Sequence, residues 1–183
     1  QACSLELVHA ASSASRHVAL VLGSTLPHFD GMNLRLEGEK LVYHGQATDP
    51  AQPHPEPLRL LAKMGLKYLG APYVWGGRSP FGIDCSGLVQ VLYKVLGTAL
   101  PRDAKDQIAF GESVDFAHAA QTGDLAFFDN AEGRVTHVGM LLEPGKILHA
   151  SGRVRIDALD QQGIYNSETK SYSHKLRLIK RLL

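Results

Sequence analysis

One cysteine constrains this sequence more than any other residue. Cys85 lies between Asp84 and Ser86, a glycine-rich stretch at residues 76–82 precedes it, and apolar residues at helical spacing follow it up to residue 96. A cysteine in the first turn of a helix feels the positive end of the helix dipole, so we expect the pKa of this thiol to be lowered and its thiolate to be favoured. The stretch therefore predicts a cysteine nucleophile at a helix N-terminus, with a small buried hydrophobe as the alternative.

Residues 48–57 divide the chain in two. They contain four prolines, which continue neither a helix nor a central strand, so we expect a stiff, extended linker. Before it, short apolar runs separated by turn residues recur at roughly ten-residue spacing, which predicts a small, mostly β, barrel-like domain over residues 1–47. The expected strands are residues 17–22, 26–29, 34–36 and 41–44.

Residues 58–183 follow a different pattern, in which helices come first and strands second. Helical spacing at residues 58–69 and after Cys85 gives way to apolar runs separated by turn signals. This order predicts an α+β domain, with helices packed on an antiparallel sheet, rather than a parallel α/β sheet. The expected strands are residues 125–128, 136–142, 146–150, 154–156 and 176–182, while residues 157–171 are expected to form a loop with little structure.

Composition narrows the classes of function. The formal net charge is +1, so we expect no nucleic-acid binding, and no apolar run reaches the roughly 18 residues of a membrane-spanning helix. The chain begins at Gln1 rather than Met, so we expect that an upstream segment, such as a signal peptide, was removed or left out. Arithmetic allows a disulfide between Cys3 and Cys85, but this bond would silence the nucleophile.

A thiol nucleophile needs a base, and histidine is the usual one. His137 and His149 stand on successive strand candidates joined by one turn. On antiparallel neighbours they can lie side by side, one facing the thiol and the other orienting it through the second ring nitrogen. Structural histidines are one alternative, and a zinc site with Cys85 is another, although the usual ligand spacing is absent. The remaining histidines are expected to be structural or exposed: His9, His17, His28, His44, His54, His118 and His174.

Six short motifs stand in a fixed order after the linker. They are Pro72-Tyr73-Val74-Trp75-Gly76-Gly77, Asp84-Cys85-Ser86-Gly87-Leu88-Val89, Pro101-Arg102-Asp103, Gly123-Asp124-Leu125-Ala126-Phe127-Phe128, His137-Val138-Gly139-Met140 and Ile147-Leu148-His149-Ala150-Ser151. In order and spacing they resemble the NlpC-type cell-wall cysteine peptidases. The resemblance covers about residues 58–183, and residues 1–47 more weakly resemble the bacterial Src-homology type β-barrel that precedes such domains.

The resemblance implies a papain-like α+β fold and a set of catalytic roles. Cys85 matches the nucleophile, His137 the general base and His149 the third polar residue of the triad. Tyr73 matches a tyrosine whose hydroxyl lies near the nucleophile, where it would help to stabilise the tetrahedral intermediate together with the Cys85 backbone N–H.

The resemblance also implies a substrate side of the site. Asp84, Ser86 and Asp103 match positions that line it, and a carboxylate there suits the free amine of an N-terminal L-Ala. Trp75, like Tyr73, is either a core aromatic or part of the wall of this cleft. Residues 1–57 are expected to lie where they could border it.

The implied activity is hydrolysis of bacterial peptidoglycan stem peptides at the γ-D-glutamyl–diamino acid bond, with diaminopimelate as the expected diamino acid. The reaction would pass through a thioester acyl-enzyme and need no metal or organic cofactor. An N-acetylmuramoyl-L-alanine amidase and a catalytically silent wall-binding module are the alternatives. We expect a monomer in the cell envelope, periplasmic or secreted, and a cytoplasmic recycling role stays open.

Overall fold

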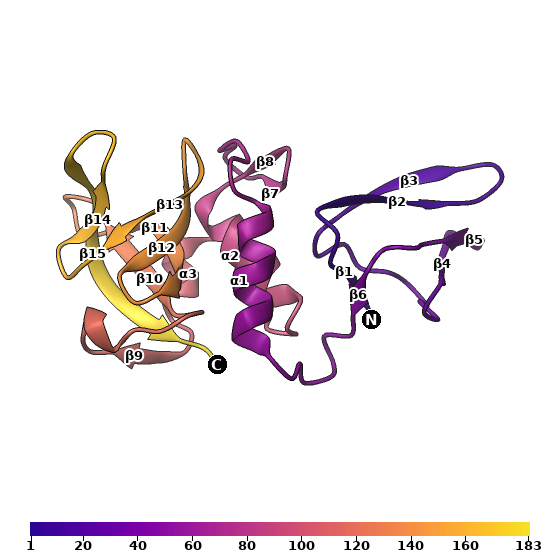
Figure 1. Ribbon diagram of the computed structural model, residues 1–183, viewed down its shortest axis with the longest axis horizontal. Coiled ribbons are helices and arrows are strands. Elements are labelled where there is room, and N and C mark those ends of the chain that lie inside the picture. The colour runs from indigo at the N-terminus through magenta and orange to yellow at the C-terminus, as the bar shows by residue number, and fades with distance from the viewer.

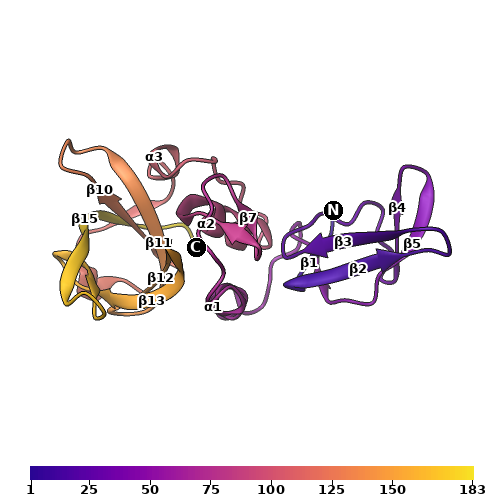
Figure 2. The same ribbon diagram turned by 90° about the horizontal axis from the view of Figure 1, so that it is seen from above.

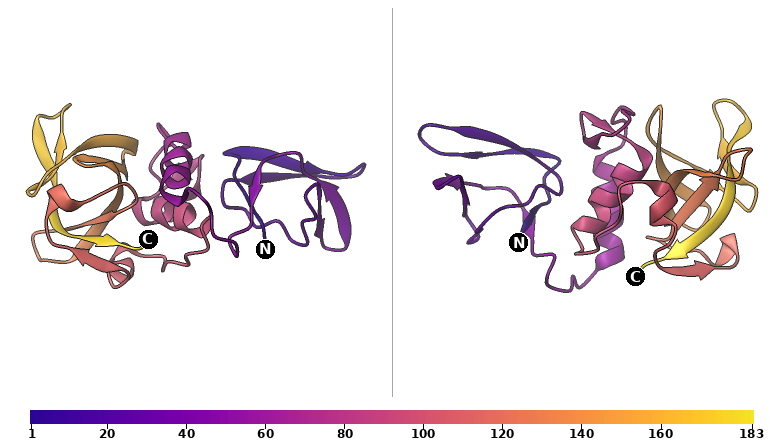
Figure 3. Two further views of the ribbon diagram at one scale, coloured as in Figure 1. Left: turned by 60° about the horizontal axis from the view of Figure 1, so that its bottom comes forward. Right: turned by 180° about the vertical axis from the view of Figure 1, so that it is seen from behind.

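Two helices lie between two groups of strands in the computed structural model, which describes residues 1–183 (Figure 1). The N-terminal strands lie on one side of the helices and the larger C-terminal sheet on the other. The chain passes from the first group into the first helix along an extended segment (Figure 3). This order of elements confirms the predicted α+β fold with a small β unit ahead of the helices.

The N-terminal unit consists of a four-stranded antiparallel sheet in the order β3-β2-β5-β4 and a two-stranded pair, β1-β6. Its small core includes Leu34, Leu41 and Tyr43. The Tyr43 hydroxyl bonds Ser4 Oγ at 2.7 Å, which ties the β1–β6 pair to this core. The strands are β1 (Cys3–Ser4), β2 (Val8–Ser12), β3 (His17–Val21), β4 (Asn33–Leu36), β5 (Glu39–Val42) and β6 (Ala47–Thr48).

The strand expected at residues 26–29 does not form. Only Thr25 makes an isolated bridge there, to Cys3, and Leu26 is fully buried in the small core. The Asp30 carboxylate accepts the backbone N–H groups of Met32 and Asn33 at 3.0 and 2.7 Å. Before this turn, the N–H of Leu26 donates to the carbonyl of Ala2 at 2.8 Å and the carbonyl of Pro27 accepts the N–H of Arg35 at 2.9 Å. These single bonds to two different segments do not make a ladder, so the apolar residues fill the core as a loop.

The helices are α1 (Pro57–Lys67), α2 (Cys85–Lys94) and the short α3 (Ala104–Gln107), with a 3₁₀ turn η1 (Ala117–Ala119). A small hairpin, β7 (Arg78–Ser79) and β8 (Gly82–Ile83), leads into α2. Gly97 follows α2 with a positive φ of 82°, and a side chain there would strike the carbonyl of Pro50, so the linker passes close to this helix end. No helix combines the length and the apolar character that a membrane span requires.

The C-terminal sheet closes on itself. Its strand order is β10-β11-β12-β13-β14-β15-β9, and β15 also pairs with β10, which gives the curved wall seen from above in Figure 2. All of its pairings are antiparallel. The strands are β9 (Glu112–Val114), β10 (Leu125–Asp129), β11 (Val135–Glu143), β12 (Lys146–Ser151), β13 (Arg153–Leu159), β14 (Gly163–Asn166) and β15 (Ser171–Arg181).

Side chains alternate between the two faces of this sheet and so build two cores. Phe128, Leu141 and Ile147 point to the inside of the closed sheet. Phe127 and Leu148 belong to the larger core that also contains the buried faces of α1 and α2. The sheet is therefore apolar on both faces, of which one lines the inside of the closed sheet and the other packs on the helices.

The expectation of a loop with little structure at residues 157–171 is wrong. β13 runs to Leu159, and β14 pairs with both β13 and β15. Tyr165 faces Tyr172 across the β14–β15 pair, with ring centroids 5.4 Å apart. The strand depends on pairing with these two neighbouring strands, because its four residues are too few to show an alternating pattern in the sequence.

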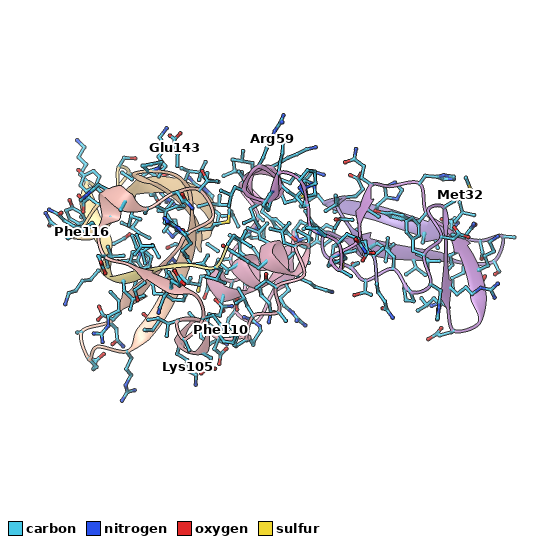
Figure 4. The ribbon with its side chains drawn as sticks, turned by 90° about the horizontal axis from the view of Figure 1, so that it is seen from below. Met32, Arg59, Lys105, Phe110, Phe116 and Glu143 are labelled. Atoms are coloured by element: carbon cyan, nitrogen blue, oxygen red, sulfur yellow. The ribbon has the colours of Figure 1, made fainter.

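The N-terminal unit packs directly on the helices. Leu5 and Leu22 join the main core, and Lys94 Nζ donates to the carbonyl of Gly23 at 2.7 Å and to Thr25 Oγ1 at 3.0 Å. In Figure 4, Met32 marks the far end of this unit, opposite Phe116 at the start of η1 and Glu143 at the end of β11. The division into residues 1–47, 48–57 and 58–183 stays a prediction about independently folding units.

Truncation of Leu61 on α1 should destabilise the protein far more than truncation of Leu66. Leu61 is fully buried, whereas Leu66 is 44% exposed on the same helix. We expect Leu61→Ala to lower the free energy of unfolding by about 2–5 kcal/mol, since it leaves a cavity in the main core, and Leu66→Ala to change it by less than about 1 kcal/mol. Urea denaturation followed by circular dichroism measures both, and equal losses would contradict this packing of α1.

Candidate functional site

Cys85 is the first residue of α2, and Asp84 is the N-cap of this helix. The Asp84 side chain accepts the backbone N–H of Gly87 at 2.7 Å, which fixes the first helical turn. Only 6% of Cys85 is exposed, and the backbone N–H of Val138 on β11 lies against its sulfur. The thiol is therefore held between a helix N-terminus and the sheet, as the sequence predicts.

The expectation of a lowered thiol pKa is wrong for the free protein. Burial raises the pKa of Cys85 and outweighs the N–H groups of Val138, Ser86 and Cys85 itself, which lower it; the negative charge of Asp84 raises it further. Desolvation here exceeds the effect of these backbone N–H groups. Cys85 is consequently a neutral thiol at rest, and a base has to take its proton during attack.

His137 on β11 and His149 on β12 meet directly. His137 Nε2 and His149 Nδ1 are 2.9 Å apart, and the two rings are nearly perpendicular at 86°. Both side chains are buried, with exposures of 6% and 1%. Since Nε2 of His137 is used in this bond, its Nδ1 is the nitrogen left to face a thiol proton. The predicted juxtaposition of the two histidines is present in the structure.

A carboxylate lies behind His149. Asp157 on β13 accepts a bond at 2.8 Å from His149 Nε2 and is held by Arg155, whose Nε and Nη2 donate to its two oxygens at 2.7 and 3.0 Å. Burial alone would raise the pKa of Asp157, but the bonds from Arg155 and His149 outweigh it and lower the pKa. Asp157 is thus ionised at neutral pH.

A third histidine covers the face of His137. The ring of His174 on β15 stacks on that of His137, with centroids 4.1 Å apart and planes at 24°. His174 Nδ1 bonds its neighbour Ser173. His174 is therefore part of the site rather than an isolated structural or exposed residue, as it had been expected to be.

The three histidines are neutral at neutral pH because they lie in a poorly solvated place. Burial lowers the pKa of His137 well below its ordinary value, and the neighbouring His174 and His149 lower it further. Burial also lowers the pKa of His149, although Asp157 opposes this effect. The pKa of His174 falls to about 4, again mainly through burial. The site at rest holds a thiol and uncharged imidazoles.

Donor atoms of His137, His149 and His174 lie within 4.8 Å of one another, which is close enough to raise the question of a metal ion. Two of these nitrogens already bond each other, and the remaining nitrogen of His149 bonds Asp157. A shared ion would have to break the bond between His137 and His149. The hydrogen bonds already made by these nitrogens therefore suit proton transfer better than coordination.

Asp84 is saturated by contacts within the protein. Arg102 Nη1 and Nη2 donate to its two oxygens at 3.0 and 2.5 Å, and the backbone N–H of Gly76 donates at 2.7 Å. Burial raises the pKa of Asp84, but Arg102 and the N–H groups of Gly87 and Gly76 outweigh it, so the pKa is lowered. Arg102 also donates to Ser86 Oγ at 2.9 Å. These bonds make one wall of the site rigid.

A cavity of about 480 Å³ opens beside the thiol, a size typical of ligand sites. It brings together the predicted residues Tyr73, Trp75, Asp84, Cys85, Ser86 and Asp103. Trp75 is 83% exposed, so it belongs to the cleft rather than to the core. The other residues that line the cavity are Gly76, Arg102, Ala104, Lys105, Val135 and Thr136. None of these comes from residues 1–57, so the N-terminal unit does not line the cavity.

Sequence reasoning assigned no role to Arg102, Asp157, Arg155 or His174. A signal for Asp157 exists: the tight turn at Gly152 pairs His149 with Arg155, so the side chain two residues further along falls on the same face. His174 carries no such signal, because β15 reaches the site only through the closure of the sheet. Lys105, for which no role was expected either, lies on α3 (Figure 4).

The sequence and the fold both have known relatives. The model of the NlpC/P60 family matches residues 70–173. The chain is similar to the gamma-D-glutamyl-L-lysine dipeptidyl-peptidase of Bacillus cereus (strain ATCC 10987 / NRS 248), with 44% identity over 92 residues, which cover 49% of this chain and 27% of that protein. It is also similar to the protein of the same name from Bacillus subtilis (strain 168), with 38% identity over 115 residues, 62% of this chain and 38% of the relative.

A solved structure extends the likeness to the whole chain. The crystal structure of an NlpC/P60 family protein from Bacillus cereus ATCC 10987 matches with a TM-score of 0.79 at 26% sequence identity, and the match covers 100% of this chain and 63% of that one. The N-terminal strands are therefore included in the similarity. The chain itself spans 27% and 38% of the length of the two curated relatives.

The free energy of unfolding should fall as the pH is lowered from about 6.5 toward 4. A histidine whose pKa is lowered by folding binds protons more readily in the unfolded chain, so its contribution is complete above the unfolded value of about 6.5 and is lost toward the folded value. For His174 the folded value is about 4. We expect His174→Phe, which keeps a ring on His137, to flatten this slope by up to about one proton. Urea titrations across this range measure it, with exposed His44→Phe as control; equal slopes would contradict the assignment.

Alkylation of Cys85 by iodoacetamide should accelerate with pH without a plateau below about pH 8.5, the ordinary thiol pKa. The reason is that burial raises the pKa of this thiol in the free protein. The measurement is made by mass spectrometry in a Cys3→Ala background, where Cys85 is the single cysteine. A plateau of reactivity near pH 6 would instead reveal a standing thiolate–imidazolium pair.

Proposed function

Because the chain belongs to the NlpC/P60 family, we propose that it is a cysteine endopeptidase acting on bacterial peptidoglycan stem peptides, at the bond between γ-linked D-glutamate and a diamino acid such as diaminopimelate. The observation that carries this proposal is the position of the Cys85 thiol, at a helix start beside a cavity of about 480 Å³ and against the backbone N–H of Val138. The preceding residue in the chain, His137, is bonded to His149. The two Bacillus relatives, which are named gamma-D-glutamyl-L-lysine dipeptidyl-peptidases, support the choice of bond.

In the first step, Cys85 Sγ attacks the γ-carbonyl carbon of D-glutamate while its proton moves to His137 Nδ1. The carbonyl oxygen becomes an oxyanion, for which the backbone N–H of Cys85 and the hydroxyl of Tyr73 are the candidate donors, since both residues line the cavity. The His137 imidazolium then gives its proton to the amine of the diamino acid, the C–N bond breaks, and a thioester remains. Water, deprotonated by His137, hydrolyses this thioester and restores the thiol.

The cleft is lined by positively and negatively charged side chains, and the proposed peptide substrate also carries charges of both signs. Since Asp84 is saturated by Arg102, Gly76 and Gly87, we propose that its part on the substrate side is to hold Arg102 and Ser86 in place. Asp103 lines the same cavity and caps no helix N–H with its side chain. It is therefore the freer carboxylate for an N-terminal ammonium of L-Ala. Trp75 adds an exposed apolar surface.

The proposed substrate also indicates where in or outside the cell the protein would act. Peptidoglycan peptides are met in the cell envelope or outside the cell, and we propose that the protein works there, as a periplasmic or secreted enzyme. The expectation of a monomer is kept as part of the same proposal. Sedimentation of the purified chain measures the oligomeric state directly.

Replacement of Cys85 by alanine should abolish cleavage of L-Ala-γ-D-Glu-diaminopimelate. We expect the rate to fall by about 10³-fold or more, because no other group supplies the nucleophile, while circular dichroism and Tm stay close to those of the parent protein. Release of L-Ala-γ-D-Glu, followed by mass spectrometry, is the measurement. Cys3→Ala, which removes the other thiol, is the matched control.

A set of related substrates distinguishes this endopeptidase reaction from the two alternatives, an amidase and a silent binding module. The lysine analogue and the N-acetylated tripeptide report the choice of diamino acid and the need for a free amine. A muramoyl-tripeptide that yields intact tripeptide would identify an amidase instead. Retained turnover in Cys85→Ala would sink the mechanism, and binding of all these ligands without turnover in the parent protein would identify a silent binding module.

A further inference from the structure

We propose that Asp157, which lies outside the set of Cys85, His137 and His149, is a positioning residue that sets the direction of proton transfer in the site. It does so by determining which ring nitrogen of each histidine carries a hydrogen. The catalytic role of Asp157 rests on the proposed function. The positions of the hydrogens on the two histidines do not depend on it.

The first step of the argument is the state of Asp157. Its side chain is 4% exposed, and both of its oxygens accept bonds from Arg155, with distances of 2.7 and 3.0 Å. Arg155 is held in turn by Glu168 at 3.1 Å and by Asn166 Oδ1 at 3.2 Å. A buried carboxylate with a bidentate guanidinium partner is ionised and can only accept hydrogen bonds.

The second step follows from this restriction. Because Asp157 can only accept, His149 Nε2 must carry a hydrogen and donate it across 2.8 Å. A neutral imidazole carries one hydrogen, so His149 Nδ1 is then a bare acceptor. The bond of 2.9 Å to His137 therefore requires that His137 Nε2 donates.

The third step reaches the thiol. With its hydrogen on Nε2, neutral His137 presents a lone pair on Nδ1, the one ring nitrogen of this pair without a bond in the protein. That lone pair is what a general base needs in order to take the proton of Cys85. After the transfer, His137 donates from both nitrogens, and every bond behind it keeps its direction. The carboxylate of Asp157 thus keeps the hydrogen bonds from His137 through His149 in the same direction before and after the proton moves.

Other groups face these histidines and have to be considered in any pH profile. His174 on β15 stacks on His137, and its ring lies 5.7 Å from that of His149. Arg155 and Asp157 face His149 from β13, and Arg153 reaches Glu168 at 2.8 Å. None of these groups other than Asp157 accepts a hydrogen bond from His149 or His137.

The hydrogen positions can be measured without a substrate. In protein labelled with ¹⁵N-histidine, imidazole nitrogen chemical shifts distinguish protonated from bare nitrogens. We expect His149 Nε2 and His137 Nε2 to be protonated in the parent protein at pH 7, and Asp157→Asn to give a mixed or reversed pattern, because an amide can also donate. A parent protein with its hydrogen on His149 Nδ1 would overturn the proposal, even if no variant folds.

The kinetic test uses a matched pair of variants. Asp157→Asn should lower kcat by about 10- to 100-fold with little change in KM, by analogy with the loss of a carboxylate behind a metal-ligating histidine. Asp124→Asn is the control: Asp124 is also a buried carboxylate bound by both ends of an arginine, Arg181, at 2.9 and 2.7 Å, but it touches no histidine. We expect it to lose stability as Asp157→Asn does and to keep its kcat.

The outcomes separate the inference from the proposed function. Equal loss of stability in both variants, with kcat and nitrogen shifts of Asp157→Asn unchanged, would make Asp157 merely structural and overturn the inference. A parent protein inactive on every muropeptide would remove the proposed function alone, since the nitrogen shifts and the rate of Cys85 alkylation still report the direction of proton transfer. We expect Asp157→Asn to slow that alkylation at pH 7 and Asp124→Asn to leave it unchanged.

Discussion

The contact between the first turn of α2 and strand β11 is the constraint on which the rest of the site depends. It places the sulfur of Cys85 against the backbone of Val138, directly after His137 in the chain. The same contact removes the thiol from water, and the resulting desolvation outweighs the backbone N–H groups that lower its pKa. A buried neutral thiol can act as a nucleophile only if a base in a fixed position takes its proton. The packing of Cys85 therefore requires His137 to be held in place, as it is by its bond to His149, which in turn bonds Asp157.

Much of this arrangement could be predicted from the sequence, because the responsible signals are local. The helix after Cys85, the paired strands with His137 and His149, and the glycine-rich approach are all encoded by neighbours in the chain. These signals gave the α+β class, the family and the two bonded histidines. The family match over residues 70–173 agrees with them.

The remainder depends on contacts that a sequence does not display. His174 reaches His137 only because β15 closes the sheet against β10. Strand β14 is recognisable only beside its partners. The pKa of Cys85 depends on how deeply the fold buries it, which a local reading of helix dipoles leaves out. The bidentate hold of Arg102 on Asp84 joins residues that are separated by the whole of α2.

Closure of the C-terminal sheet has a consequence for the proposed action on peptides. An open sheet offers unpaired N–H and C=O groups along its outermost strand, and any extended chain can add to it. Here β10 and β15 satisfy each other, and the strand added beyond them, β9, has only three residues. A substrate-like peptide therefore finds little backbone to pair with on this sheet, and the cleft beside Cys85 has few competitors for it.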